Sequence, residues 1–153
     1  MSNKTVALAT TLGVLASIDP DAYAAGTVTT AWVPCAQWQT YMAVISAGDL
    51  GASATVDAKI EQAQDASGTG AKDLAGAEIT QLTQAGSDSN TQAIISFSAA
   101  DLDMENAFGF VRVSLTVAAA TSDAGAILLG DGCRYGPASE HDAASVGEIV
   151  IVA

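Results

Sequence analysis

The alternating stretch Gly109–Ser122 constrains the fold more than any other part of the chain. Within it, apolar residues alternate with polar ones: Val111, Val113, Leu115 and Val117 against Arg112, Ser114 and Thr116. A period of two residues is typical of a β-strand with one face in a core and the other in water. A polar turn and a second apolar run, 126–130, come directly after it. The stretch therefore predicts two successive strands.

Short apolar or alternating runs, separated by turns rich in Gly, Asp, Ser and Asn, continue along most of the chain. We expect strands at 27–34, 40–47, 54–64, 77–83, 91–98, 109–119, 125–131 and 146–152. Segment 54–64 contains helix-forming residues, but its alternation favours a strand. Segment 74–83 fits either period, which leaves open a short turn before its strand. The pattern predicts a mainly β, single-domain antiparallel β-sandwich that is jelly-roll-like.

The N-terminal region reads differently, and we divide the chain into an arm, 1–26, and a β-sandwich domain, 27–153. Residues 5–18 mix apolar residues and threonine without a clean period, which favours an extended or short-helical arm. The sequence Asp19-Pro20-Asp21 is expected to end whatever element precedes it. The same region imitates a secretory signal, but its threonines and the charges of Asp19 and Asp21 argue against cleavage.

The charge balance excludes several classes of partner. The chain carries 17 acidic and 5 basic residues, a net charge of −12, with no basic cluster. Nucleic-acid binding depends on Lys and Arg that neutralise phosphates, so we expect no nucleic-acid partner. No apolar run reaches the length of a membrane span, and an acidic chain is repelled by anionic lipid, so we expect no membrane partner.

No catalytic or metal-binding pattern emerges from the titratable residues. His141, the one histidine, lies between Glu140 and Asp142 in what reads as a solvated loop. The acidic set Asp101, Asp103 and Glu105 lacks the calcium-loop register and predicts a hydrated turn. Segment 65–70 reads as a hairpin tip, not a phosphate-binding loop. We expect no enzyme activity, no catalytic residues, no metal and no cofactor.

The cysteines and the aromatic cluster predict packing, not chemistry. Cys35 and Cys133 stand without a second pair or a metal-ligand spacing, so free, partly buried thiols are expected. Trp32, Trp38 and Tyr41 are the main aromatic cluster. Core or interface anchors are their expected use, and a sugar-binding platform is the alternative, which requires exposed, coplanar rings.

Several segments together resemble a family of small virion proteins encoded among the head genes of tailed bacteriophages. The resemblance lies in Gln39–Gly48, Val56–Thr69, Lys72–Leu74, Phe110–Val117 and Ile127–Gly130. In that family a strand ending in Gly is followed by a strand and turn of the type K-(apolar)-Q/E-x-(S/A)-x-D-(G/A)-(S/T), and later by a (Y/F)-V-R-V-x-(apolar)-T-V strand. The resemblance covers about residues 39–130.

The resemblance implies a capsid decoration, or cement, protein on the outer surface of the phage head, bound to the major capsid protein. We expect a homo-oligomer, with a trimer favoured, because repeated small contacts gain strength through multivalency. The apolar arm and one tryptophan are the candidate capsid or subunit interface: Val6, Leu8, Leu12, Val14, Leu15, Ile18 and Trp32. The alternatives are a phage tail or neck component and a secreted carbohydrate-binding β-sandwich.

Overall fold

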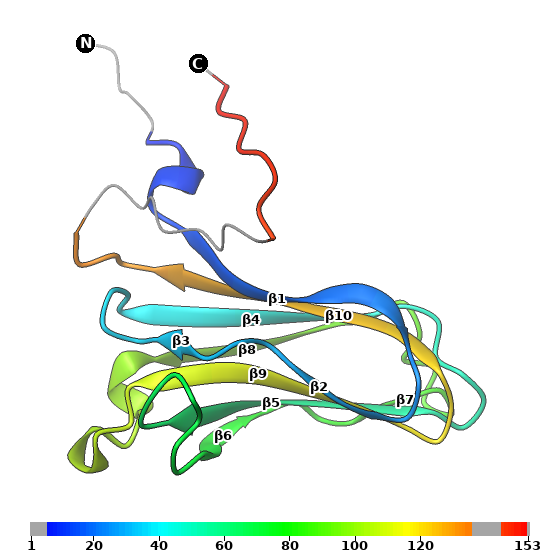
Figure 1. The fold of residues 1–153 in the computed structure, drawn as a ribbon. Coiled ribbons are helices and arrows are strands. Elements are labelled where there is room, and N and C mark those ends of the chain that lie inside the picture. The colour runs from blue at the N-terminus through cyan, green and yellow to red at the C-terminus, as the bar shows by residue number, and fades with distance from the viewer. Residues whose placement is uncertain (1–5, 136–144, 153) are drawn as a thin grey trace.

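A computed structural model describes residues 6–135 and 145–152, which form two antiparallel β-sheets packed face to face (Figure 1). The expected mainly β antiparallel sandwich is confirmed. No helix in these two ranges is long and apolar enough to cross a membrane.

The described residues form ten strands and three short 3₁₀ helices. The strands are β1 (Gly13–Tyr23), β2 (Gly26–Thr29), β3 (Val33–Pro34), β4 (Thr40–Ala47), β5 (Thr55–Ala63), β6 (Lys72–Glu78), β7 (Leu82–Thr83), β8 (Gln92–Ser98), β9 (Phe110–Ala118) and β10 (Ser122–Asp131). The 3₁₀ helices are η1 (Leu8–Thr10), η2 (Ala99–Asp101) and η3 (Met104–Asn106).

The strand order is that of a jelly roll. One sheet runs β1-β10-β4-β8 and the other β2-β9-β5-β6, with the two-residue strands β3 and β7 attached to β9 and β5. When these short strands are set aside, the first strand pairs with the last, the second with the second-last, and so inward to β5 with β6. This nested pairing is what results when one long antiparallel hairpin is rolled up, which is the jelly-roll arrangement.

The core lies between the sheets and consists of small and aliphatic side chains. The alternation in β9 buries Val111, Val113, Leu115 and Val117 completely or almost so, as the period-two pattern predicts. From the opposite sheet Ile45 and Leu128 are also fully buried. The Tyr41 and Phe97 rings stack with centroids 5.1 Å apart and supply the main aromatic contact. Without large aromatic layers, the sandwich depends on close packing of aliphatic side chains.

Hydrogen bonds tie together the loops at one end of the sandwich. The Gly48 amide donates to the Asp123 carbonyl oxygen at 2.8 Å, and the Asn90 amide donates to the Gly48 carbonyl oxygen at 2.9 Å. The buried Ser122 hydroxyl accepts from the Gly51 amide at 3.1 Å. These bonds link the β4–β5 and β7–β8 connections to the start of β10, so this end is held together within the chain.

Much of the expected arm belongs to the sandwich, because residues from Gly13 on form β1, which pairs with β10. The expectation that Asp19-Pro20-Asp21 ends the preceding element is wrong, since β1 continues to Tyr23. Pro20 lies at a register shift on an edge strand, where a missing amide hydrogen is tolerated. It packs so closely over Gly125 that a Cβ there would lie 3.1 Å from the Pro20 Cα atom. A second shift, between Val14 and Ala16, also breaks the period of two and hides the strand in the sequence.

Two other strand expectations need correction. The strand expected at 77–83 is replaced by β6 and β7, because Gly76 has a φ of 77° and the register with β5 shifts there. The strand expected at 146–152 is absent: the structure places these residues in no strand or helix. Their sequence suits a strand, but among the described residues they pair with no other strand.

Candidate interaction surface

The outward side of the β1-β10-β4-β8 sheet is apolar. Registered pairing sets Val14, Leu129, Met42 and Ser96 in one row across the four strands, and Ser17, Ile127, Val44 and Ile94 in the next. We call this surface the apolar face and define it by Val14, Met42, Val44, Ile94, Ile127 and Leu129. Ile94 is 61% exposed and Ile127 45% exposed, and the other four are half-buried.

Charge is confined to the margins of the apolar face. Neither row contains a charged residue, and the next row, Gly125, Ser46 and Gln92, is also uncharged. Acidic residues follow at both ends of the strands, with Asp131 at one end and Asp21 and Asp123 at the other. Contiguous exposed apolar surface on a small protein marks an interaction site more often than chance. The apolar face is therefore the leading candidate for a binding surface.

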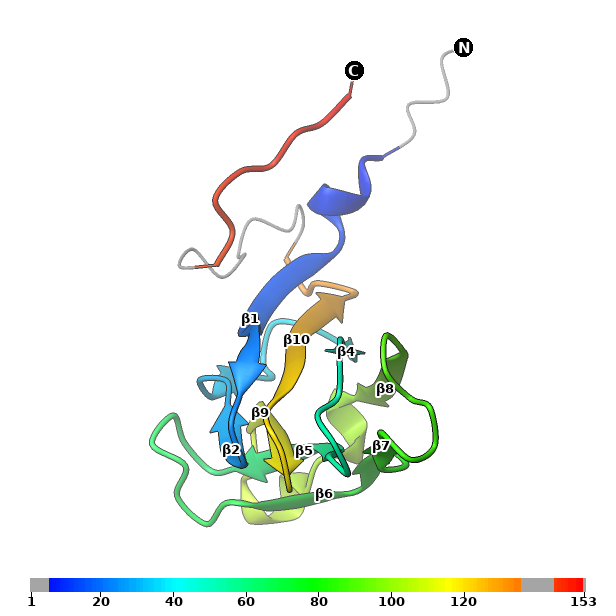
Figure 2. The ribbon, with the colours of Figure 1, turned by 90° about the vertical axis from the view of Figure 1, so that its right-hand side faces the viewer.

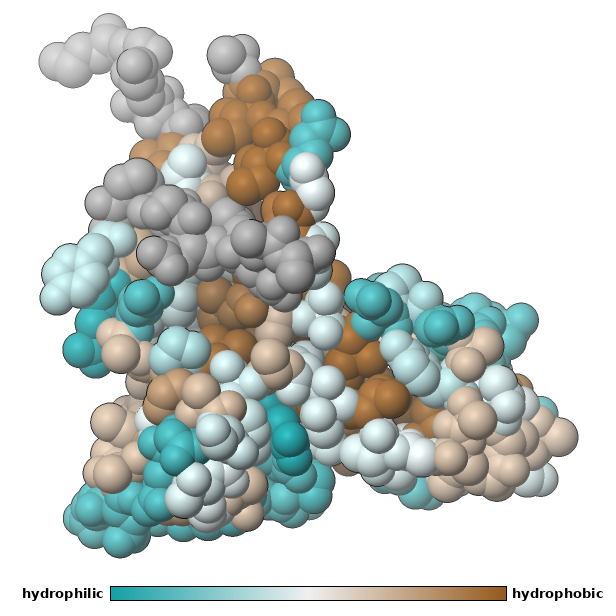
Figure 3. All heavy atoms as spheres, in the orientation of Figure 1, coloured by the Kyte–Doolittle hydropathy of each residue, from teal (hydrophilic) through white to brown (hydrophobic). Residues whose placement is uncertain are grey.

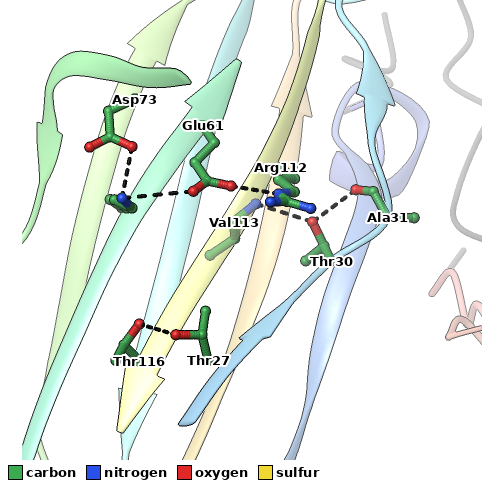
Figure 4. Close-up of polar contacts among 9 residues, drawn as sticks. Thr27, Thr30, Ala31, Glu61, Asp73, Arg112, Val113 and Thr116 are labelled. Carbon is green, nitrogen blue, oxygen red and sulfur yellow. Dashed lines mark hydrogen bonds and ion pairs between the residues drawn. The ribbon is translucent and has the colours of Figure 1, made fainter. Parts of the chain in front are cut away.

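The outward side of the β2-β9-β5-β6 sheet carries a chain of ion pairs instead (Figure 4). The Lys59 ammonium lies 2.7 Å from the Asp73 carboxylate and 3.7 Å from that of Glu61. The Arg112 Nε donates to Glu61 Oε2 at 2.6 Å, and its guanidinium stacks on the Trp32 ring, 4.5 Å from the centroid. The hydrogen bond and charge of Asp73 raise the pKa of Lys59. We call this surface the charged face.

Threonines extend the charged face toward β2. The Thr27 and Thr116 hydroxyls are 2.8 Å apart in a cross-strand hydrogen bond (Figure 4). The buried Thr30 hydroxyl donates to the Ala31 carbonyl oxygen and accepts from the Val113 amide. The hydroxyls of these three threonines are thus hydrogen-bonded within the chain.

Two further apolar segments project from the side of the sandwich that carries the β1-β10-β4-β8 sheet (Figures 1 and 2). One is the N-terminal segment, residues 6–12, in which Val6 is 65% and Leu8 68% exposed. The other is the C-terminal segment, residues 145–152, which forms an apolar column beyond the sandwich (Figure 3). Ile149, Val150, Ile151 and Val152 are all exposed in it. The apolar face and both segments therefore lie on one side of the molecule.

The candidate interface residues from the sequence are divided by the structure. Val6 and Leu8 are exposed, and Leu12, Val14 and Leu15 are half-buried. Ile18 is not available to a partner, because β1 directs it into this chain's own core at 5% exposure. Trp32 is half-buried and lies on the charged face beneath Arg112.

Sequence reasoning missed five residues of the apolar face: Met42, Val44, Ile94, Ile127 and Leu129. A signal for them was present, because the run Ala126–Leu129 is apolar at both parities of a strand. A strand with apolar residues on both faces is buried on both or is exposed to a partner on one. The alternation identified the residues that face the core. The outward-facing apolar residues of the same strands were not recognised as an exposed surface.

The aromatic cluster does not form a sugar platform, because Trp38 and Tyr41 are each only 2% exposed. The Tyr41 hydroxyl donates to the Trp38 carbonyl oxygen at 3.2 Å. Burial raises the pKa of the Cys35 thiol, which hydrogen-bonds with Tyr41, to about 11, and also raises the pKa of Tyr41. Cys35 and Cys133 are free thiols, as expected, and the first is buried and unreactive in this state.

The acidic sets serve as structural bonding partners. Asp101 caps η2 by accepting from the Ser98 amide and hydroxyl, which lowers its pKa. Asp103 pairs with Lys72 and accepts from Asn106, and these contacts lower its pKa. Asp65 accepts from the Ser67 and Thr69 amides, as a turn residue does. His141 lies outside the described residues.

No protein-family model matches this sequence, and no curated protein is significantly similar to it. Among solved structures, a chain of infectious bursal disease virus strain Gx is 10% identical with a TM-score of 0.45, covering 83% of this chain and 34% of that one. This chain thus spans about a third of the length of that viral chain. A chain of broad bean stain virus is 11% identical with a TM-score of 0.46, covering 89% of this chain and 93% of that one.

A chain from an empty virus-like particle of cowpea mosaic virus is 8% identical with a TM-score of 0.45, covering 89% of this chain and 87% of that one. Identities at this level and TM-scores below 0.5 decide neither ancestry nor function.

Proposed function

We propose that this chain is a non-enzymatic structural protein of a bacteriophage virion, a capsid decoration protein attached to the outside of the major capsid protein lattice. The observation that carries the proposal is the one-sided apolar surface: the apolar face and two projecting apolar segments on a small sandwich whose other face carries charges paired within the chain. Such a surface suits a protein that lies on a larger assembly by one side.

The charge favours a position outside the shell. With a net charge of −12, the chain would repel packaged nucleic acid if it lined the interior. On the outside, acidic residues face water, where they maintain solubility. The uncharged apolar face is the surface that meets a capsid without opposing like charges.

The jelly-roll topology is compatible with this role, since the arrangement recurs in viral capsid domains, but it also occurs in lectins and cupins. Fold alone therefore does not assign the function. The resemblance of residues 39–130 to phage head proteins supports a role in a virion. The one-sided apolar surface supports attachment through the β1-β10-β4-β8 sheet. A tail or neck component of the same virion would use the same kind of apolar surface and is the second candidate.

The proposal is tested by locating the protein in purified particles of the phage that encodes it. Quantitative mass spectrometry of separated heads and tails should find the chain in the head fraction, in a fixed ratio to the major capsid protein. Recovery in the tail fraction alone would favour the second candidate. Absence from both fractions would remove the virion role altogether.

A further inference from the structure

The edge strands of the two sheets differ in how they are protected from pairing with another chain. Natural proteins protect such edges with charged residues, proline, β-bulges or short edge strands. β1 carries Pro20 and two register shifts, β6 carries Lys72, Asp73 and Glu78, and β2 has only four residues. β8 (Gln92–Ser98) has none of these: its seven residues are uncharged, without proline, and pair with β4 in unbroken register. Among the described edges it alone is unguarded.

The hydrogen-bond pattern identifies which β8 groups face outward. The Ala47 amide donates to the Thr91 carbonyl oxygen at 2.9 Å, and the Ala99 amide donates to the Gln39 carbonyl oxygen at 3.0 Å. Hydrogen-bonded residues alternate along an antiparallel pair, so every second residue between these two bonds to β4. The residues between them, Gln92, Ile94 and Ser96, direct their N–H and C=O groups away from the sheet. Within the described residues no other strand pairs with β8 on this side.

The same chain carries a strand-forming sequence that has no strand partner. Residues 149–152 are Ile-Val-Ile-Val, among the residues most favoured in strands. Val150 is 74% and Val152 92% exposed, and the segment 146–152 belongs to no strand among the described residues. Exposing four large aliphatic side chains to water is unfavourable relative to burying them.

We propose that residues 146–152 of one copy add as a strand to the free edge of β8 in a second copy, so that the chain assembles with itself by strand exchange. Main-chain hydrogen bonds to Gln92, Ile94 and Ser96 supply the affinity, as in other cases where an extended segment extends a sheet. The segment's alternate side chains then contact the apolar face beside Ile94, whose own side chain is 61% exposed.

The distribution of charge is consistent with pairing of residues 146–152 with β8 of a second copy of this chain. Two copies with a net charge of −12 repel over most of their surfaces. The segment 146–152 carries one charged residue, Glu148, and β8 carries none, so this pairing opposes no like charges. In Figures 1 and 2 the segment projects beside β1, the strand at the opposite edge of the sheet from β8. Pairing between copies therefore does not require the segment to fold back across its own sheet.

The inference concerns the isolated protein and does not depend on the proposed virion role. Sedimentation velocity over a wide concentration range should show wild-type oligomers. Ile151→Pro removes an amide hydrogen from the segment, and Ser96→Pro removes an outward one from β8, where proline is tolerated at an edge. Each should weaken self-association at least about tenfold, since losing one or two net hydrogen bonds has that effect. Ile151→Val and Ser96→Thr are the matched controls and should associate like wild type.

The double variant Ile151→Pro/Ser96→Pro should be no weaker than the more affected single variant, because both changes act on one contact. A wild-type protein that is monomeric at every concentration would overturn the inference, as would proline variants that assemble normally. Monomers whose Ile94 and Ser96 amides are protected from hydrogen exchange, with protection lost in Ile151→Pro, would show that the segment pairs within its own chain. None of these three results would affect the head-location experiment.

Discussion

The two outward faces of the sandwich are built from the same backbone pattern but present opposite chemistry. On the charged face, Lys59, Glu61, Asp73 and Arg112 neutralise one another in a continuous chain of ion pairs. On the apolar face, two successive rows across four strands contain no charge, and both of their isoleucines are exposed. Solvent-facing strands commonly alternate apolar-in and polar-out, and only the charged face follows that rule.

The two outward faces therefore differ in how they interact with water. The charged face is suited to contact with water, since its ion-paired side chains are partly exposed. The apolar face loses free energy in water and gains it when covered. We infer that the first face remains exposed in the assembled state and the second does not.

The largest effect is expected when a charge is placed in the centre of the apolar face. Ile127→Lys should reduce attachment to capsids at least about a hundredfold, because burying an unpaired ammonium costs several kcal/mol. The free protein should remain folded, since Ile127 is already 45% exposed. Co-sedimentation with undecorated capsids measures the loss. Thr29→Lys, on exposed β2 of the other sheet, is the control, and equal loss in both variants would contradict the comparison.

A second change tests the charged face. Glu61→Gln removes the carboxylate that lies between Lys59 and Arg112, at 16% side-chain exposure. The free energy of unfolding should fall by about 1–2 kcal/mol, because Arg112 loses a charge-assisted hydrogen bond in a partly buried setting. Chemical denaturation gives the value, with exposed Glu105→Gln as a near-neutral control. Capsid attachment should not change, and a parallel loss of attachment would place this face in the interface.

A third prediction concerns the core between the two faces, and the pH dependence of the free energy of unfolding. Burial raises the folded pKa of Cys35 from an ordinary value of 9.0 to about 11, so folding favours the protonated thiol. Its contribution to stability is complete below pH 9 and is lost as the pH rises toward 11. The free energy of unfolding should therefore fall by about 1 kcal/mol between pH 8 and pH 10. Denaturant titrations at several pH values measure this slope, and Cys35→Ala should flatten it. A slope that is unchanged in Cys35→Ala would remove the thiol as its source.

The smallest effect is expected from salt. Contacts made by an uncharged face are insensitive to screening, and repulsion between acidic surfaces is screened within about 8–10 Å at physiological ionic strength. Attachment should persist or tighten slightly between low and moderate salt. A titration of capsid occupancy against sodium chloride measures this. A steep loss of binding at moderate salt would indicate an electrostatic contact to a basic patch instead.

The sequence predicted the fold where the period of two was unbroken. β4, β5, β8 and β9 follow the alternation closely and lie where it placed them. β1 was missed because register shifts on either side of Ala16–Ile18 reset the alternation, and because Pro20 at an edge strand looks like a terminator. The register shifts and the edge position of Pro20 cannot be recognised without knowing which strand lies beside β1.

The candidate surface was only partly predictable. Val6, Leu8 and Ile18 were chosen as interface candidates because they are apolar. Val6 and Leu8 are exposed, but strand β1 turns Ile18 into the core. The apolar face depends on pairing Ile94, Val44 and Ile127 across three strands that are far apart in the sequence. Register of this kind is a tertiary property, and the strand patterns alone do not contain it.

The most direct test of the comparison is a cryo-electron microscopy map of particles that carry this protein, at a resolution that separates the two sheets. We expect the β1-β10-β4-β8 sheet to face the capsid lattice, with Ile127 and Ile94 in the contact and Lys59 and Arg112 in solvent. A map in which the β2-β9-β5-β6 sheet lies against the lattice and the apolar face is open to solvent would contradict it.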